Sequence, residues 1–258
     1  MKNYVQSLNR ALDIVEALNE PPYELGCNEL AREIGLSSST VHRLLITLEA
    51  RGYIYQNPRN SKYRLGFRLL DLKNSAFNSK LTNLKEVALY YMEKLAESSR
   101  ETIGLGILDK QEVLHLARVE SPEVLKANLE HFRLPATSSA IGKYLLAWLP
   151  EQKLDMILPS TFPMRTGNTI TSLIKLKEEF IEIRKQNFAM DNEEGFEGVR
   201  CIATGIHDNQ NNVVAAISII APANRFPDTK IPVFRDMLFS VAKDINNKMQ
   251  MKLKDEII

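Results

Sequence analysis

The stretch that decides the fold of the first part of the chain runs from Cys27 to Ile54 and reads CNELAREIGLSSSTVHRLLITLEARGYI. It predicts a short helix that ends at Gly35, because glycine readily takes the left-handed backbone that stops a helix. A longer helix follows, with Val41, Leu44, Leu45 and Leu48 along one face. Serine is unfavourable inside a helix but good at its start, where the hydroxyl caps a free backbone N–H. One cap, Ser37 or Ser38, is enough, so the other hydroxyls of the SSST run need another partner.

The residues on either side extend this unit. We expect Ser7 to cap a first helix with an apolar stripe of Leu8, Ala11, Leu12, Val15 and Leu18, and Asn28 to cap the short helix. After Gly52, residues 53–56 and 62–65 are typical of two short strands joined by a turn. Two helices that meet at a tight turn, followed by a hairpin, describe a winged helix-turn-helix. In that motif the second helix enters the major groove of DNA.

Charge supports the same interpretation. The whole chain has a net charge of +1, whereas residues 40–80 carry eight Lys/Arg and two Asp/Glu, a net of +6. A basic segment of this kind is the footprint expected of a DNA-binding surface. A solvated face, or a helical unit that binds a protein, remains open as an alternative. The predicted DNA contacts are Ser38, Ser39, Thr40, His42, Arg43 and Thr47 on the helix, and Arg10, Arg59 and Lys62 at phosphates or the minor groove.

The rest of the chain predicts a linker and an α+β domain. The boundaries that we expect are a DNA-binding domain at residues 1–66, a linker helix at 67–81 and a second domain at 82–258, opening with a helix capped by Thr82. The strands expected there include a hairpin around residues 102–119 and a third strand at 124–130, in a mostly antiparallel sheet covered by helices. The two cysteines, Cys27 and Cys201, lie far apart. With no bilayer-length apolar run and no signal peptide, we expect a reduced, cytoplasmic protein without a membrane partner.

The segments SLNRALDIVEAL, ELAREIGLSSSTVHRLLITLEARGYI and YRLGFRLLDL resemble the N-terminal domain of the IclR family of bacterial transcription regulators. Each motif of that domain has a counterpart here, apart from Val15 in place of a leucine. The resemblance extends over essentially the whole chain. It implies a winged helix-turn-helix joined by a helical linker to a GAF/PAS-like effector-binding domain, in homodimers that pair into tetramers, with no cofactor.

The resemblance also implies the residues of an effector pocket. The segment GVRCIATGIHD matches the family's motif around a pocket cysteine as far as Ala203. Ile220 stands where relatives often have a second serine, and Ala140 and Ile141 replace smaller residues, so we expect a more apolar effector. The complete set of expected effector contacts is Leu125, Leu129, Ala140, Ile141, Asp191, Cys201, Ser218 and Ile220.

The sequence therefore predicts a DNA-binding regulator without catalytic or metal-binding residues. We expect it to bind a palindromic operator as a repressor under the control of a small organic acid, although activators share this layout. One alternative is a redox enzyme that uses Cys201. Against it, the sequence has no second, resolving cysteine near Cys201. A catalytic triad or a metal site built on Cys201 and His207 is not expected either, because the two residues are six apart in a predicted strand, about 20 Å, too far for proton transfer. The other alternative is a constitutive DNA-binding protein whose second domain only forms oligomers.

Overall fold

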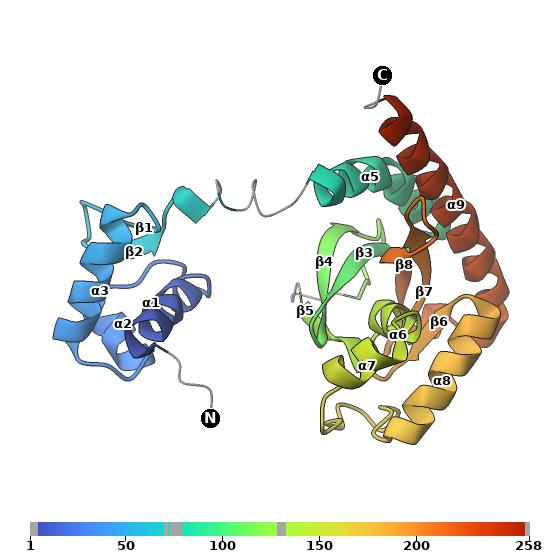
Figure 1. Cartoon of the computed structure of the whole chain (residues 1–258), viewed down its shortest axis with the longest axis horizontal. Helices are drawn as coiled ribbons and strands as arrows, with labels where there is room; N and C mark the ends of the chain where they lie inside the picture. Colours follow the sequence, from blue (N-terminus) through green and yellow to red (C-terminus); the bar gives the residue numbers. More distant parts are fainter. Residues whose placement is uncertain (1–4, 70–71, 73–78, 128–132, 256–258) are drawn as a thin grey trace. The chain divides into compact units, whose positions relative to one another are not determined.

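The computed structural model describes residues 5–69, 72, 79–127 and 133–255, and the chain divides into two units, residues 1–80 and 81–258 (Figure 1). Most of the predicted linker helix at 67–81 lies outside the described residues. The helix expected to start at Thr82 is α5 (Ser79–Ser99), which begins three residues earlier.

The first unit is a winged helix-turn-helix. Its elements are α1 (Gln6–Ala17), α2 (Cys27–Glu33), α3 (Ser38–Ala50), β1 (Ile54–Gln56) and β2 (Tyr63–Leu65). The two strands pair antiparallel and form the wing. Gly52, just beyond α3, has the left-handed backbone, with φ of 75°. The core of this unit consists of buried residues from all these elements: Ile14, Leu18, Leu25, Leu30, Ala31, Val41, Leu45, Ile54 and Tyr63.

The predicted face of the first helix is only partly correct. Leu18 is buried, and Ala11 and Val15 are half-buried, but two of the predicted leucines are exposed. Leu8 and Leu12 are 59% and 50% exposed, whereas Ile14 is fully buried. The apolar residues of α1 occupy more than one side of the helix, so spacing alone does not decide which side meets α2 and α3. The expected caps of two helices are also wrong: Ser7 lies inside α1, after its N-cap Val5, and α2 starts after Gly26 rather than Asn28. Gly26 N–H instead donates to the Glu29 carboxylate, at 2.6 Å.

The second unit contains a six-stranded sheet in the order β5-β4-β3-β8-β7-β6, antiparallel throughout. Its strands are β3 (Thr102–Asp109), β4 (Glu112–Val119), β5 (Arg133–Pro135), β6 (Ala189–Asn192), β7 (Val199–His207) and β8 (Val213–Pro222). Its longer helices, besides α5, are α6 (Ala140–Ala147), α7 (Glu151–Ile157), α8 (Leu173–Gln186) and α9 (Ile231–Asp255); the 3-10 turns are η1 (Ala136–Ser138), η2 (Ala223–Arg225) and η3 (Asp228–Lys230). The expected α+β class with an antiparallel sheet is confirmed.

The described part of one predicted strand, residues 124–127, does not form a strand. Residues 124–127 are bent chain, and residues 128–132, with Leu129, lie outside the described part. The strand that pairs with β4 is β5, further along. Segment 124–127 is exposed except for Ala127. Its apolar residues therefore mark a surface segment instead of a strand.

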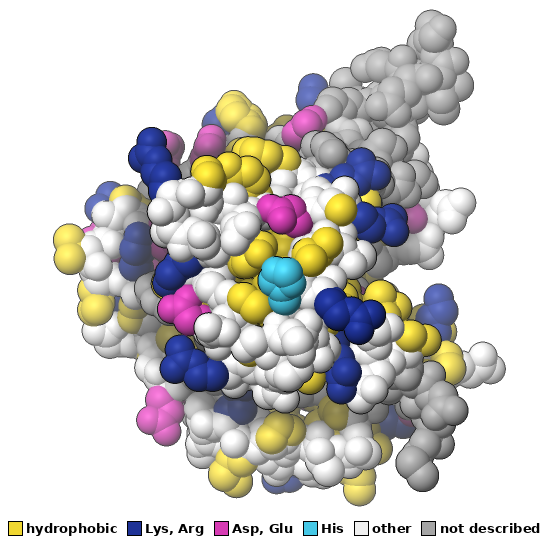
Figure 2. All heavy atoms as spheres, turned by 90° about the vertical axis from the view of Figure 1, so that its left-hand side faces the viewer, with side chains coloured by type: hydrophobic (Ala, Val, Ile, Leu, Met, Phe, Trp, Pro, Cys, Tyr) yellow, Lys and Arg dark blue, Asp and Glu magenta, His cyan; other side chains and the backbone are white. Residues whose placement is uncertain are grey.

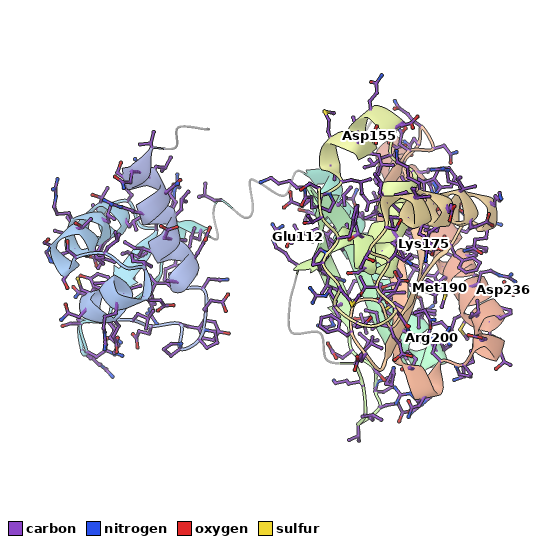
Figure 3. All side chains as sticks on the ribbon, turned by 90° about the horizontal axis from the view of Figure 1, so that it is seen from below. Glu112, Asp155, Lys175, Met190, Arg200 and Asp236 are labelled. Atoms are coloured by element: carbon purple, nitrogen blue, oxygen red, sulfur yellow. The ribbon has the colours of Figure 1, made fainter. Side chains whose placement is uncertain are left out.

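The two faces of this sheet have different partners. On β7, Cys201 and Ala203 belong to a core with α6 and α8. Residues between them, such as Ile202, point to the opposite face, where α9 packs against β7 and β8. Figure 3 labels Met190 on β6 and Arg200 on β7, each adjacent in sequence to a residue on the α6 side. The face toward α6 is the one that carries the predicted effector contacts.

Candidate DNA-binding and effector sites

The hydroxyl-rich start of α3 is a hydrogen-bonded cluster. Ser37 is the N-cap, and its Oγ accepts from the backbone N–H of Thr40 at 3.3 Å. The same Oγ lies 3.1 Å from Ser39 Oγ and 2.9 Å from Thr40 Oγ1. Ser38 Oγ donates to Asn28 Oδ1 on α2 at 2.8 Å. These hydroxyls therefore stabilise the turn between α2 and α3, and DNA contacts must be added to bonds that already exist.

The middle of α3 presents groups with no such partners. His42, Arg43 and Ile46 are exposed on the side opposite Val41 and Leu45, which are fully buried. Among the residues that the structure describes, no partner is found for the His42 or Arg43 side chain. The face displayed in Figure 2 shows a histidine with hydrophobic side chains beside it and both basic and acidic side chains around it. An exposed helix face with unpaired donors suits the base edges of a major groove.

Thr47 and the wing differ from the simplest expectation. Thr47 Oγ1 donates to the Arg43 carbonyl within α3, at 3.1 Å. Lys62, directly before β2, has its Nζ 3.1 Å from both carboxylate oxygens of Glu29. A phosphate must therefore compete with Glu29 for this ammonium group. Arg59 is exposed at the tip of the wing, and Arg10 is half-buried on α1.

The second unit holds a pocket on the α6 side of the sheet. The structure brings together six of the predicted effector contacts at its wall: Ala140, Ile141, Asp191, Cys201, Ser218 and Ile220. Leu125 does not line it: the side chain is 61% exposed, and its backbone carbonyl accepts from Arg225 Nη1 at 2.6 Å. The open volume inside the pocket is about 20 Å³, which is enough for roughly one water molecule. A larger molecule can enter only if part of the wall moves.

Strand register explains how the polar wall is assembled. Asp191, Cys201 and Ile220 are paired across β6, β7 and β8 and form one row. The second serine that the family resemblance implies would stand at position 220, beside Cys201, where this chain has the Ile220 side chain. Ser218 lies two residues along β8, opposite Gly104 of β3. A Cβ on Gly104 would lie 3.0 Å from Ser218 Oγ, so the glycine leaves room for this hydroxyl.

The polar groups of the wall are unusual in their protonation and partners. Asp191 Oδ1 accepts from the N–H groups of Glu194, at 2.7 Å, and Gly195, at 3.3 Å. Burial nevertheless raises the pKa of Asp191 from 3.8 to about 7. Ser218 is 1% exposed, and its Oγ has no hydrogen-bond partner within the described structure. A buried hydroxyl without a partner is costly and indicates that a ligand or water satisfies it.

Cys201 is poorly suited to redox chemistry. Its side chain is 7% exposed. Burial, followed by the nearby Asp191 carboxyl, raises the pKa of the thiol well above its usual 9.0. The thiolate is the reactive form of cysteine, and this environment disfavours it. The arrangement supports a wall residue over a nucleophile.

Several wall residues were not predicted from the sequence. They are His115, Leu134, Pro135, Ser138, Ser139, Arg165, Gly195, Phe196 and Val199. Ser139 is also the N-cap of α6: its Oγ accepts from Gly142 N–H at 3.2 Å. Arg165 comes from an irregular loop, where its Nε donates to the Gly195 carbonyl at 3.2 Å. No local pattern marks a loop residue of this kind, because its position depends on contacts with residues about 30 positions away.

A winged helix-turn-helix unit and a separate unit with a small pocket, whose wall carries buried polar groups, are the arrangement expected of a DNA-binding regulator with its own ligand-binding domain. Two family profiles match the chain: "IclR helix-turn-helix domain" over residues 7–58 and "Bacterial transcriptional regulator IclR C-terminal" over residues 78–247. The chain belongs to the IclR family of bacterial transcriptional regulators. It is therefore a DNA-binding regulator of transcription and not an enzyme.

Relatives match along nearly their full length. The transcriptional regulator XynR of Escherichia coli K12 is 35% identical over 236 residues, which cover 91% of this chain and 93% of XynR. KdgR of the same organism is 34% identical over 247 residues, 95% of this chain and 93% of KdgR.

Solved structures agree with this assignment. The Thermotoga maritima IclR structure has a TM-score of 0.75 and 27% identity, covering 95% of this chain and 99% of that chain. An IclR homologue from Microbacterium hydrocarbonoxydans complexed with 4-hydroxybenzoate has a TM-score of 0.78 and 25% identity, covering 93% and 99% of the two chains. Within the described residues no helix is long and apolar enough to cross a membrane, and no cluster of His, Cys, Asp or Glu is suited to hold a metal ion.

Proposed function

We propose that this protein is a repressor that binds a palindromic operator as a homodimer, or as a tetramer of two dimers, and leaves it when a small organic acid occupies the pocket. The observation that carries the proposal is the Ser218 hydroxyl, buried and unpartnered in a wall that also presents Asp191. A structural core would have satisfied or replaced such a group. The relatives include one named a transcriptional repressor, IclR of E. coli, at 31% identity.

An acid is favoured by the charges around the pocket. Arg165 lies at the wall, where its Nε donates to the Gly195 carbonyl and its guanidinium lies over the Phe196 ring, 5.3 Å from the ring centroid. Its terminal N–H groups hydrogen-bond to none of the described residues, so they can bind a carboxylate. Lys143, which lies behind the wall, is already paired with Glu194 and Glu179. The solved homologue with 4-hydroxybenzoate supports an acid of moderate size. Ile141 and Ile220 favour a ligand with an apolar body next to its polar end.

Control of DNA binding requires that the acid prefer one conformation. A ligand shifts an equilibrium only by its difference in affinity for the two states. Because the pocket has an open volume of about 20 Å³, the acid should select a state in which the start of α6 or the turn after Asp191 has moved outward. If that state holds the DNA-binding units differently, operator affinity changes by the same coupling free energy.

The first test is selection of bound sequences from random DNA with the full-length protein at fixed salt. A recovered palindrome supports the proposal, and its half-site spacing reports how the DNA-binding units are spaced. The recovered duplex then becomes the probe for release by a panel of carboxylic acids that includes 4-hydroxybenzoate. Release that is lost in the Ser218→Ala variant, with unchanged binding of the duplex alone, assigns the response to this pocket. If the protein binds a palindromic duplex and neither an acid nor a metabolite extract makes it release that duplex, the result supports the alternative of a constitutive DNA-binding protein.

A further inference from the structure

Ile46 is an exposed apolar side chain in the middle of the DNA-recognition face. It is 53% exposed. It follows Arg43 by three residues and His42 by four on α3, so all three share one side of the helix. The helix buries its other side through Val41 and Leu45. Packing within the unit therefore does not account for an isoleucine here.

Isoleucine is also an unfavourable choice for an exposed helix position. Its branched Cβ restricts the side chain to one main rotamer and lowers helix propensity relative to Lys, Glu or Ala. Single exposed apolar residues are common on proteins. On this face, however, the same stiffness means that little side-chain entropy is lost on binding. The neighbours, His42 and Arg43, are polar groups without protein partners in the described structure.

The major groove offers one strongly apolar group, the 5-methyl group of thymine. Arginine most often reads a guanine there. We propose that Ile46 contacts a thymine methyl group within about two base pairs of the guanine that Arg43 would read. This inference rests on the proposed operator recognition through α3. Side chains three apart on a helix have Cβ atoms about 5–6 Å apart, and base pairs are stacked about 3.4 Å apart. The two contacts are therefore one to two base pairs apart, on either strand.

The contact should be worth about one buried methyl group, or roughly four-fold in affinity for each half-site. The probe is the duplex recovered by selection with the full-length protein. Thymines within two base pairs of the Arg43-dependent guanine are replaced one at a time by deoxyuridine, which removes only the methyl group. The replacement that removes the contacted methyl group, made in both half-sites, should weaken binding by about 16-fold.

The Ile46→Ala variant completes the test, because alanine is a better helix former and the position is exposed. This variant should bind the original duplex more weakly, and the deoxyuridine replacement should then have no further effect. Ile174→Ala is the matched control: the same substitution at a 72% exposed isoleucine of the second unit. This control should leave unchanged the affinity for the original duplex, the affinity for the deoxyuridine duplex, and therefore the effect of removing the methyl group.

Two results would overturn the contact while leaving operator recognition intact. One is a palindrome with an Arg43-dependent guanine and no methyl-dependent thymine within two base pairs. The other is a methyl dependence that persists in Ile46→Ala, which would assign the contact to another side chain. Selection that yields no consensus at all would overturn both this inference and the proposed function.

Discussion

Replacing Lys143 by methionine should destabilise the second unit severely. Lys143 lies on α6, and its side chain is 1% exposed. Its Nζ is 2.5 Å from Glu194 Oε1 and 3.1 Å from Glu179 Oε1. The Glu194 side chain is 7% exposed and that of Glu179 is 30% exposed. Methionine keeps most of the apolar stem but removes the positive charge, so Glu194 would remain as a buried carboxylate without its partner.

Loss of one partner from a buried ion pair costs about 3–5 kcal/mol, because the remaining charge is desolvated. Glu179 reaches water, so its loss of the lysine adds little to the cost. We therefore expect a loss of stability at the lower end of this range, about 3 kcal/mol. The chain offers a matched control in Lys177, whose Nζ is 3.2 Å from Asp155 Oδ1 with side chains 40% and 58% exposed. An exposed pair contributes less than about 1 kcal/mol. Lys177→Met should therefore be nearly neutral.

Tryptophan fluorescence during urea unfolding of the full-length protein measures this difference. The chain has one tryptophan, Trp148, which directly follows α6, so the signal reports the second unit. Lys143→Met should lower the transition midpoint far more than Lys177→Met at similar slope. Adding Glu194→Gln to Lys143→Met should recover part of the loss, because an amide leaves no unpaired charge. Equal midpoints for the two single variants, or no recovery in the double variant, would refute the reasoning.

Three further predictions use the same protein. Asp191 has a pKa of about 7 in the folded state against 3.8 ordinarily, so the folded state retains a proton that the unfolded chain releases. Stability should therefore fall as the pH rises from about 4 to about 7. In Asp191→Asn the unfolding midpoint should change less over that pH range. Gly142→Ala would place a Cβ 2.2 Å from the Ala136 carbonyl oxygen, so α6 must shift and unfolding should cost about 1–3 kcal/mol less, by the same assay; an unchanged midpoint would contradict this. Fluorescence anisotropy with the selected duplex and with random DNA compares two variants. Arg43→Ala should reduce the discrimination between the two DNAs by about 1–3 kcal/mol, whereas Lys62→Ala should weaken binding to both alike and lower the slope of affinity against salt by about 1. Equal effects of the two variants would count against this division.

Local patterns predicted much of the fold. Ser37, one of the two serines expected there, caps α3, and the expected hairpin around residues 102–119 forms as β3 and β4. These features depend on residues within a few positions of each other, so they can be read from the chain. The same approach was wrong where two local answers were equally good. In α1 apolar residues lie on several sides, and only packing selects Ile14 over Leu8.

The sequence by itself determined the type of each unit, the buried face of α3 and, through family resemblance, six residues of the pocket wall. The tertiary structure alone decided which groups are already engaged. Ser38 is bonded to Asn28, and Lys62 is paired with Glu29, 33 residues away. It also placed Arg165 at the pocket and buried Asp191 enough to raise its pKa. Partners, burial and protonation depend on distances between atoms far apart in the chain, and those distances exist only once the sheet and helices have packed together.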